Sequence, residues 1–354
     1  GLATYDFSHK YLFEFNIGYT GSERFAPTNR YGLFPSAAIG WVISEEDFFR
    51  KAVPWMNRLK IRYSDGLVGS DYAENRWLYI SDYTMASNGL ISEDLGANAS
   101  AQWEQSHKRD IGLEVGILDN MFTFTIDAYD EYRDKMLLSP RSVTILVGNS
   151  FKELNLGSLK KHGIEFEAVF NKTVSNNLNY FVKGNFSFNE NRIISKDDLP
   201  YAPEYIKESG KPIDAMLTGV LLTNSGYFTS VDDLHTKSAP LALNLLSLGD
   251  YEFLDFNGDG QITALDRYPI KGHDYPPMIF SLSAGFSYKA FDFRLMVQGN
   301  VGKYVNFNQN FENEFLLGDY SVKKSQLDYW TPGNPNATHS TLHYFEIGKT
   351  SCRE

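Results

Sequence analysis

The strongest pattern in this sequence is an alternation of apolar and polar residues with a period of two. Phe122, Phe124 and Ile126 occupy alternate positions, and Thr123 and Asp127 lie among the positions between them. Successive side chains of a β-strand point to opposite faces, so this pattern predicts strands with one apolar face and one polar face. Similar alternation covers residues 11–19, 164–170, 180–189 and 291–298.

The alternation predicts ten strands, and their connections vary in length in a regular way. The predicted strands cover residues 2–7, 10–20, 31–43, 58–66, 101–118, 121–135, 158–171, 178–190, 278–288 and 291–301. Tight connections are expected at Ser8-His9, Asp119-Asn120, Thr173–Asn177 and Lys289-Ala290. Long connections cover 67–100, 136–157 and 191–277. The connection at 44–57 is intermediate and carries a short acidic and aromatic helical stretch over residues 45–49.

Two all-β architectures fit strands of this kind. A transmembrane antiparallel β-barrel has tight turns on the periplasmic side and long loops outside, so every second connection is long. A soluble β-sandwich also contains hairpins, but it does not need that regular alternation of connection lengths. The connections therefore favour the barrel, and the sandwich is the alternative.

The composition of the 354 residues fits either β architecture and excludes some other classes of protein. Aromatic residues make up 15%, and the net charge of −11 disfavours a nucleic-acid-binding role. The mean hydropathy is −0.34, and we find no apolar run near the ~18 residues that a membrane-spanning helix requires. The single cysteine, Cys352, excludes an internal disulfide framework. Aromatic residues near predicted strand ends could form interfacial girdles or pack in a core: Tyr19, Tyr31, Trp41, Tyr63, Trp103, Tyr129, Tyr132 and Tyr180.

Residues 255–266 have the spacing of a twelve-residue calcium loop. The predicted oxygen ligands are Asp255, Asn257, Asp259, Gln261 through its backbone carbonyl, Thr263 and Asp266. Gly260 stands at the sixth position, where the sharp turn requires it. The flanking sequence does not predict the two helices of an EF-hand, so we expect a structural Ca²⁺ rather than a signalling switch. A metal-free turn rich in Asp, Asn and Gly is the alternative.

No enzyme motif is present in the sequence. The seven histidines show no metal-ligand spacing, and there is no Gly-x-Ser-x-Gly, Walker or His-Glu-x-x-His motif. Carboxylate pairs such as Asp197-Asp198 are expected to be solvated loop charges. On the strands, one polar face is expected to line the barrel lumen with Glu165, Glu167, Lys183, Asn185, Arg294 and Gln298.

Six groups of residues, in order along the chain, resemble the barrel of SusC/RagA-type TonB-dependent transporters of Bacteroidetes. They are NRYGLFPS (29–36) with GWVISEE (40–46), LKIR (59–62) with GLVG (66–69), WE (103–104) with IGLE (111–114), NLG (155–157) with HGIE (162–165), DFNGDG (255–260), and WTP (330–332) with NPNA (334–337). Each group is a weak signal alone, but the ordered set is specific.

The resemblance implies a 22-stranded outer-membrane barrel, of which residues 1–354 would be a partial barrel domain. Residues 191–277 would be a long extracellular loop, and the family's signal sequence, plug domain and last strands have no counterpart in the sequence. The family implies import of oligosaccharides or peptides without covalent chemistry. Its partners would be a SusD-like surface lipoprotein, the TonB-ExbB-ExbD complex and outer-membrane lipid. The sequence does not identify the substrate-binding residues.

Two other functions remain as alternatives. A secreted, calcium-stabilised β-sandwich that binds or cleaves glycans would explain the calcium-type loop and the surface aromatics. A passive porin would explain the strands, but it would explain neither the calcium-type loop nor the family motifs.

Overall fold

The computed structural model describes residues 1–143, 145–175, 178–213, 215–217, 226–238, 246–267, 269–304 and 324–340. The chain divides into two compact units. The first comprises Gly1–Ala202, Lys207–Asp214 and His273–Lys303, and the second comprises Pro203–Ile206, Ala215–Gly272 and Tyr304–Glu354.

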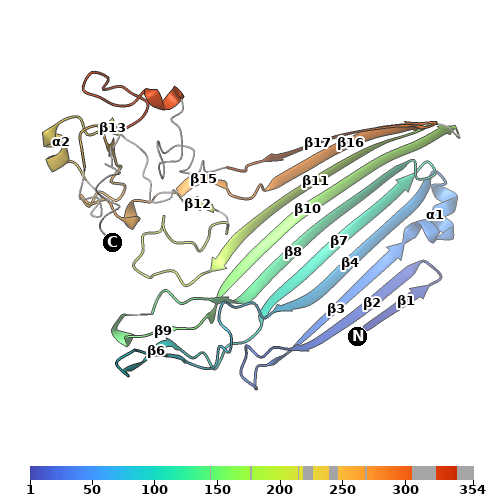
Figure 1. Cartoon of the computed structure of the whole chain (residues 1–354). Coiled ribbons are helices and arrows are strands. Elements are labelled where there is room, and N and C mark those ends of the chain that lie inside the picture. Colours follow the sequence, from blue (N-terminus) through green and yellow to red (C-terminus); the bar gives the residue numbers. More distant parts are fainter. Residues whose placement is uncertain are drawn as a thin grey trace. The chain divides into compact units, whose positions relative to one another are not determined.

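The first unit is built on one antiparallel sheet of ten strands, whose order in space follows the sequence (Figure 1). The strands are β1 (Leu2–Phe7), β2 (Tyr11–Gly21), β3 (Tyr31–Val42), β4 (Met56–Ser70), β7 (Glu104–Ile117), β8 (Phe122–Leu138), β10 (Leu154–Ser175), β11 (Leu178–Ser195), β16 (Met278–Tyr288) and β17 (Phe291–Val301). All ten predicted strands are confirmed. They form a single sheet rather than two packed sheets, so the β-sandwich prediction is not supported.

The tight turns of this sheet adopt left-handed backbone conformations. Ser8 and His9 have φ of 54° and 55°, and Asp119 and Asn120 have φ of 58° and 59°. Positive φ lets a short hairpin turn follow the right-handed twist of the strands. The predicted turn at Thr173–Asn177 lies partly outside the described residues. The intermediate connection contains the 3-10 helix η1 (Ile43–Glu45) and the helix α1 (Asp47–Ala52), which confirms the predicted helical stretch.

Strand register gathers the apolar residues of all ten strands on one face of the sheet, which we call the apolar face. One row across the paired strands is Phe7, Tyr11, Trp41, Ile61, Leu113, Ile126, Phe166, Phe186, Phe280 and Gly299. Most of its large side chains, including Ile61, Ile126 and Phe280, are exposed. A soluble sheet would bury such a face, whereas a barrel turns it to lipid.

The opposite, polar face has its own continuous row. It runs Lys60, Glu114, Thr125, Glu167, Asn185, Ser281 and Gln298 through the same strand pairs. β10 has 22 residues and β8 has 17, which exceeds the ~9–11 residues that cross a bilayer. The strands therefore continue beyond the membrane.

The long connections contain structure that the alternation did not predict. In the first unit, β5 (Asp82–Met85), β6 (Ile91–Gly96) and β9 (Ser150–Phe151) form a three-stranded sheet, and η2 spans Ile145–Val147. Near them, a hydrophobic cluster comprises Phe25, Ala73, Leu78, Ala101 and Trp103. Trp103 is buried in this cluster, so of the two alternatives for this residue, core packing is the one that the structure shows. Residues of the long connections pack against one another in this cluster, which explains the burial of the Trp103 ring.

The second unit contains short elements. They are β12 (Ala215–Leu217), which pairs with β15 (Pro269–His273), β13 (Gly226–Tyr227), which pairs with β14 (Tyr251–Glu252), and α2 (Val231–Thr236), η3 (Ala264–Asp266) and η5 (Lys324–Leu327). Within the described ranges, no helix has the length and apolar character to cross a membrane.

Candidate functional site

Arg62 on β4 is the centre of an ion-pair network on the polar face. Its Nη1 atom donates to Asp110 Oδ1 on β7 at 3.1 Å, and its Nη2 atom donates to Asp127 on β8. Its Nε atom lies 3.8 Å from Glu114 Oε1. Lys60 Nζ also donates to Glu114, at 3.3 Å. One guanidinium therefore joins three adjacent strands through three carboxylates.

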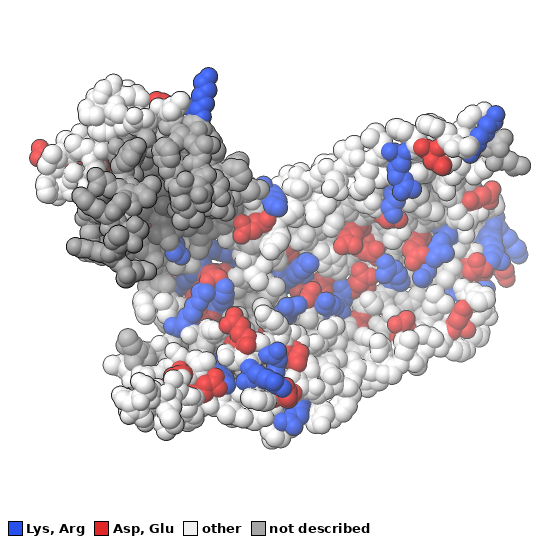
Figure 2. Space-filling model, in the orientation of Figure 1, with Lys and Arg blue, Asp and Glu red and all other residues white. Residues whose placement is uncertain are grey.

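Two further polar contacts continue this network across the sheet. Lys183 on β11 lies 2.7 Å from Glu167 on β10, and Asn185 donates from Nδ2 to Ser281 Oγ at 3.1 Å. Figure 2 shows acidic and basic side chains interspersed over the face in view, with neither sign dominating. The mixture of signs lets neighbouring charges neutralise one another inside a water-filled barrel.

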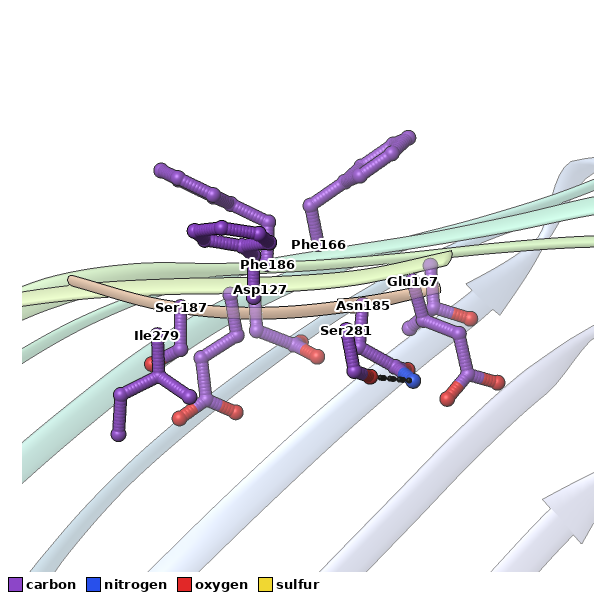
Figure 3. A pocket seen from close by; sticks show the side chains of 11 residues that line it. Asp127, Phe166, Glu167, Asn185, Phe186, Ser187, Ile279 and Ser281 are labelled. Carbon is purple, nitrogen blue, oxygen red and sulfur yellow. Dashed lines mark hydrogen bonds between the residues drawn. The ribbon is translucent and has the colours of Figure 1, made fainter. Parts of the chain in front are cut away.

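The predicted lumen residues do share one face of the sheet. Glu165 and Glu167 pair with Ser187 and Asn185, and Lys183 pairs with Ser283 of the next strand. Figure 3 shows Glu167, Asn185 and Ser281 on one side of the sheet, and the rings of Phe166 and Phe186 on the other. The depression that these side chains line therefore draws on both faces, so it is not an enclosed ligand cavity.

The polar face offers groups that bind polar partners. Its side chains are fixed charges, amides and hydroxyls that can bind water, a polar solute or another polar surface. Among the described residues, no three His, Cys, Asp or Glu side chains gather into a group that could hold a metal ion.

The alternating pattern predicted which face of the sheet carries the residues of the ion-pair network, but it did not predict that Arg62 lies at the centre of the network. Arg58, Lys60 and Arg62 stand at alternate positions, which is a usable signal for one shared face. The partners of Arg62 come from β7 and β8, 48 to 65 residues away. Only the register of the folded sheet brings them together.

A second cluster that sequence reasoning missed lies in the outer connections. Lys152 is 2% exposed, and its Nζ atom lies 2.8 Å from Asp82 Oδ1 and 3.3 Å from the Trp77 carbonyl. The Glu153 carboxylate accepts hydrogen bonds from the backbone N–H groups of Glu74 at 2.8 Å and Asn75 at 3.1 Å. Burial acts to raise the pKa of Glu153, but these hydrogen bonds outweigh it and hold the pKa below its ordinary value.

The predicted calcium ligands form one compact turn. Asp255 accepts hydrogen bonds from the N–H groups of Gly258 at 2.8 Å and Gly260 at 2.7 Å, and both glycines have positive φ. Partial desolvation acts to raise the pKa of Asp255, but these hydrogen bonds keep it below its ordinary value. Asp259 accepts a hydrogen bond from Gln261 N at 2.8 Å and one from Asn257 Nδ2 at 2.9 Å.

The last predicted ligands face inward. Asp266 is buried, and its carboxylate accepts hydrogen bonds from Phe256 N at 2.9 Å and from Thr263 N at 2.7 Å. The Thr263 hydroxyl accepts a hydrogen bond from Leu265 N at 3.1 Å. The turn carries oxygen atoms of the type that Ca²⁺ prefers, and in this structure those of Asp255 and Asn257 accept hydrogen bonds from N–H groups of the turn itself.

Comparison with known proteins was made over the whole chain, and no protein-family profile matches it. The chain is 28% identical over 347 residues to the TonB-dependent receptor SusC of Bacteroides thetaiotaomicron, which covers 92% of this chain and 32% of that protein. It is 27% identical over 355 residues to the TonB-dependent receptor P3 of Formosa agariphila, which covers 95% and 34%. The chain thus spans about a third of the length of these relatives.

Solved structures agree with these relatives. The structure of the RagAB peptide transporter matches with a TM-score of 0.68 and 20% identity, over 96% of this chain and 37% of that chain. The RagAB peptide importer in its "closed-closed" state matches with a TM-score of 0.66 and 20% identity, over 94% and 36%. At this identity the structures show the fold, and the sequence relatives are TonB-dependent receptors by name. These comparisons support a SusC/RagA-type TonB-dependent transporter fragment for this chain, and its ten-stranded sheet is part of an outer-membrane β-barrel.

Proposed function

We propose that the protein containing this chain imports large nutrients across the outer membrane. The substrates would be oligosaccharides or peptides, and import would be energised by TonB-ExbB-ExbD. A SusD-like surface lipoprotein would cover the long loops and help to capture the substrate. The observation that carries this proposal is the division of one ten-stranded sheet into a lipid-type apolar face and an ion-paired polar face, in a chain related to SusC over nearly its full length.

The polar face supports a passage that is occupied by polar material. Arg62 and its carboxylate partners would be costly to keep in an apolar environment, but they are stable beside water or a polar plug. The relatives are receptors and a peptide transporter by name, and none is named as an enzyme. We therefore assign no covalent chemistry to the proposed function.

Import can be tested in the source bacterium with the full-length gene. We expect deletion to abolish growth on one class of oligosaccharide or peptide, and re-introduction of the intact gene to restore it. A matched strain should carry the intact receptor without a functional TonB. Unchanged uptake after deletion would refute import, and uptake that persists without TonB would favour a passive pore.

We also propose that the 255–266 turn binds a structural Ca²⁺. Extracellular sites of this kind bind in the ~10⁻⁴–10⁻³ M range, so millimolar Ca²⁺ is the relevant probe. We expect Ca²⁺ to slow proteolysis of this turn in the intact receptor, and Asp255→Asn with Asp259→Asn to remove that protection. Equal cleavage rates with Ca²⁺ and with chelator would contradict the proposal.

A further inference from the structure

The connection between β3 and β4 is held firmly against the turn end of the sheet. Figure 1 shows α1 at the same end as the tight β1–β2, β10–β11 and β16–β17 turns. The Glu46 carboxylate accepts hydrogen bonds from Lys10 Nζ at 3.0 Å, Tyr11 Oη at 2.9 Å and Trp41 Nε1 at 3.3 Å. At the far end of the connection, the Trp55 carbonyl accepts a hydrogen bond from Leu118 N at 3.0 Å. The connection is therefore fixed to β2, β3 and the β7–β8 turn.

This firmly held segment exposes large apolar side chains. Phe48 is 62% exposed and Trp55 is 52% exposed, although Ile43 and Ser44 beside them are buried. Arg50 and Lys51 are exposed on the same short helix. Arg50 pairs with Glu45, and Lys51 has no acidic partner among the described residues. Exposed aromatic rings next to basic side chains are typical of a segment that lies in a membrane interface.

The segment is continuous with the apolar face of the sheet. Tyr11 and Trp41 belong to the apolar row, and their rings stack with centroids 6.5 Å apart and planes 12° apart. The polar atoms of both rings point to Glu46, while the ring bodies remain on the apolar face. Tyr and Trp take this arrangement where hydrocarbon meets headgroups, because one end of each ring is apolar and the other is polar. The arrangement around Glu46 is therefore the one expected at the edge of a membrane.

We propose that residues 43–55 form an interfacial anchor in the periplasmic leaflet of the outer membrane. Phe48 and Trp55 insert among the phospholipids to the shallow depth of ~5–10 Å that such segments reach. Arg50 and Lys51 lie beside the phosphate groups. Among the described residues, the tight turns at the same end have no comparable segment, so this anchor fixes the height of the barrel at β3 and β4. The proposal rests on the outer-membrane position of the sheet and not on the identity of the imported substrate.

The depth of Phe48 can be measured in the full-length receptor reconstituted in phospholipid vesicles. An environment-sensitive fluorophore is attached at Phe48→Cys in a background in which Cys352 and any other reactive cysteine are replaced. The matched control is Asp292→Cys, which lies on the polar face one pair from the β16–β17 turn. We expect a blue shift at position 48, and quenching by a headgroup-proximal nitroxide roughly twofold stronger than by a chain-terminal one. Position 292 should show neither effect.

The basic residues give a second, independent measurement. Arg50→Gln with Lys51→Gln should weaken the quenching at position 48 in vesicles that contain phosphatidylglycerol, and should change it little in pure phosphatidylcholine. Water-like emission and free access of iodide at position 48 in vesicles would overturn the proposal. Protection that appears only after addition of a periplasmic protein would also overturn it, because it would assign the surface to a protein partner.

Discussion

At the scale of single residues, Arg62 joins three carboxylates of two neighbouring strands. Its guanidinium contacts carboxylates from β7 and β8, so its loss would leave Asp110, Asp127 and Glu114 near one another without the shared cation. The neighbouring Arg58 contacts only Glu114, which Lys60 also neutralises. The two arginines therefore form a matched pair for measuring what the network contributes.

We expect Arg62→Gln to lower the free energy of unfolding of the intact receptor by ~1–3 kcal/mol. The Arg62 side chain is 37% exposed, so this range already allows for solvent screening. Arg58→Gln, at a site that is 54% exposed, should cost ~1 kcal/mol or less. Thermal or denaturant unfolding in detergent measures both. Equal losses in the two variants would show that the network adds nothing beyond separate surface pairs.

A cluster of carboxylates in the outer connections joins residues 141–142, 196–198 and 208–209 in a contact that depends on pH. Asp197 accepts hydrogen bonds from Ser142, and Asp198 accepts them from the N–H groups of Glu208 and Ser209. Glu208 pairs with Lys196 and Arg141. Desolvation acts to raise the pKa of all three carboxyl groups, but these contacts outweigh it and lower each pKa below its ordinary value of 3.8 for Asp or 4.5 for Glu.

We expect this contact to be stable at neutral pH and to be lost in acid. A carboxyl group with a lowered pKa in the folded state stabilises that state above its ordinary pKa, and the stability declines as the pH falls through the folded pKa. Amide hydrogen exchange over residues 140–143 and 196–210, corrected for intrinsic rates, should therefore be slow at pH 7 and should increase below about pH 4. Glu208→Gln should weaken the contact at pH 7 and flatten the profile. Protection that rises on acidification would contradict this sign.

At the scale of elements, the outer connections owe their order to two buried charged residues. Lys152 and Glu153 stand next to β9, and their partners lie 70 or more residues earlier in the chain. Alternation predicted none of β5, β6 or β9, because these strands have two to six residues and their order comes from distant contacts. An alternating pattern predicts local structure only. It does not predict which distant carboxylate will accept a hydrogen bond from an unpaired backbone N–H group.

We expect Glu153→Ala to loosen these connections while the ten-stranded sheet stays folded. The change leaves the N–H groups of Glu74 and Asn75 without their acceptor, which costs ~1–3 kcal/mol for each group that stays buried. Limited proteolysis between residues 71 and 103 should become faster. Glu93→Gln, at an exposed position in β6, is the control and should leave the rate unchanged. Loss of the whole sheet in Glu153→Ala would show that the connections are not a separate unit of stability.

At the scale of the whole molecule, the ten-stranded sheet was the feature best predicted from the sequence, and the ion-pair network around Arg62 was the least well predicted. The period-two pattern holds wherever a strand has lipid on one side and water on the other. The face of the sheet on which Phe166 or Glu167 lies could therefore be predicted from the sequence alone. The turn at residues 255–266 was equally visible in the sequence, because the residues that form it are close along the chain. Arg62 as a centre, Glu46 as an acceptor and Trp103 as a core residue depend on contacts between segments far apart in the sequence, which spacing along the chain does not encode.

The two edges of the sheet lead to the last prediction. β1 and β17 each pair with one neighbour only, so each presents a row of backbone N–H and C=O groups without a strand partner in the described sheet. Unpaired backbone groups are not tolerated at membrane depth, because lipid cannot satisfy them. We expect the 354-residue chain, expressed alone and added to vesicles, to produce neither stable single-channel conductance nor the heat-modifiable mobility of a closed barrel. The full-length receptor, refolded in parallel, is the control. A stable pore made by one copy of this chain would show that β1 and β17 can pair with each other, and the ten strands would then be a barrel in their own right.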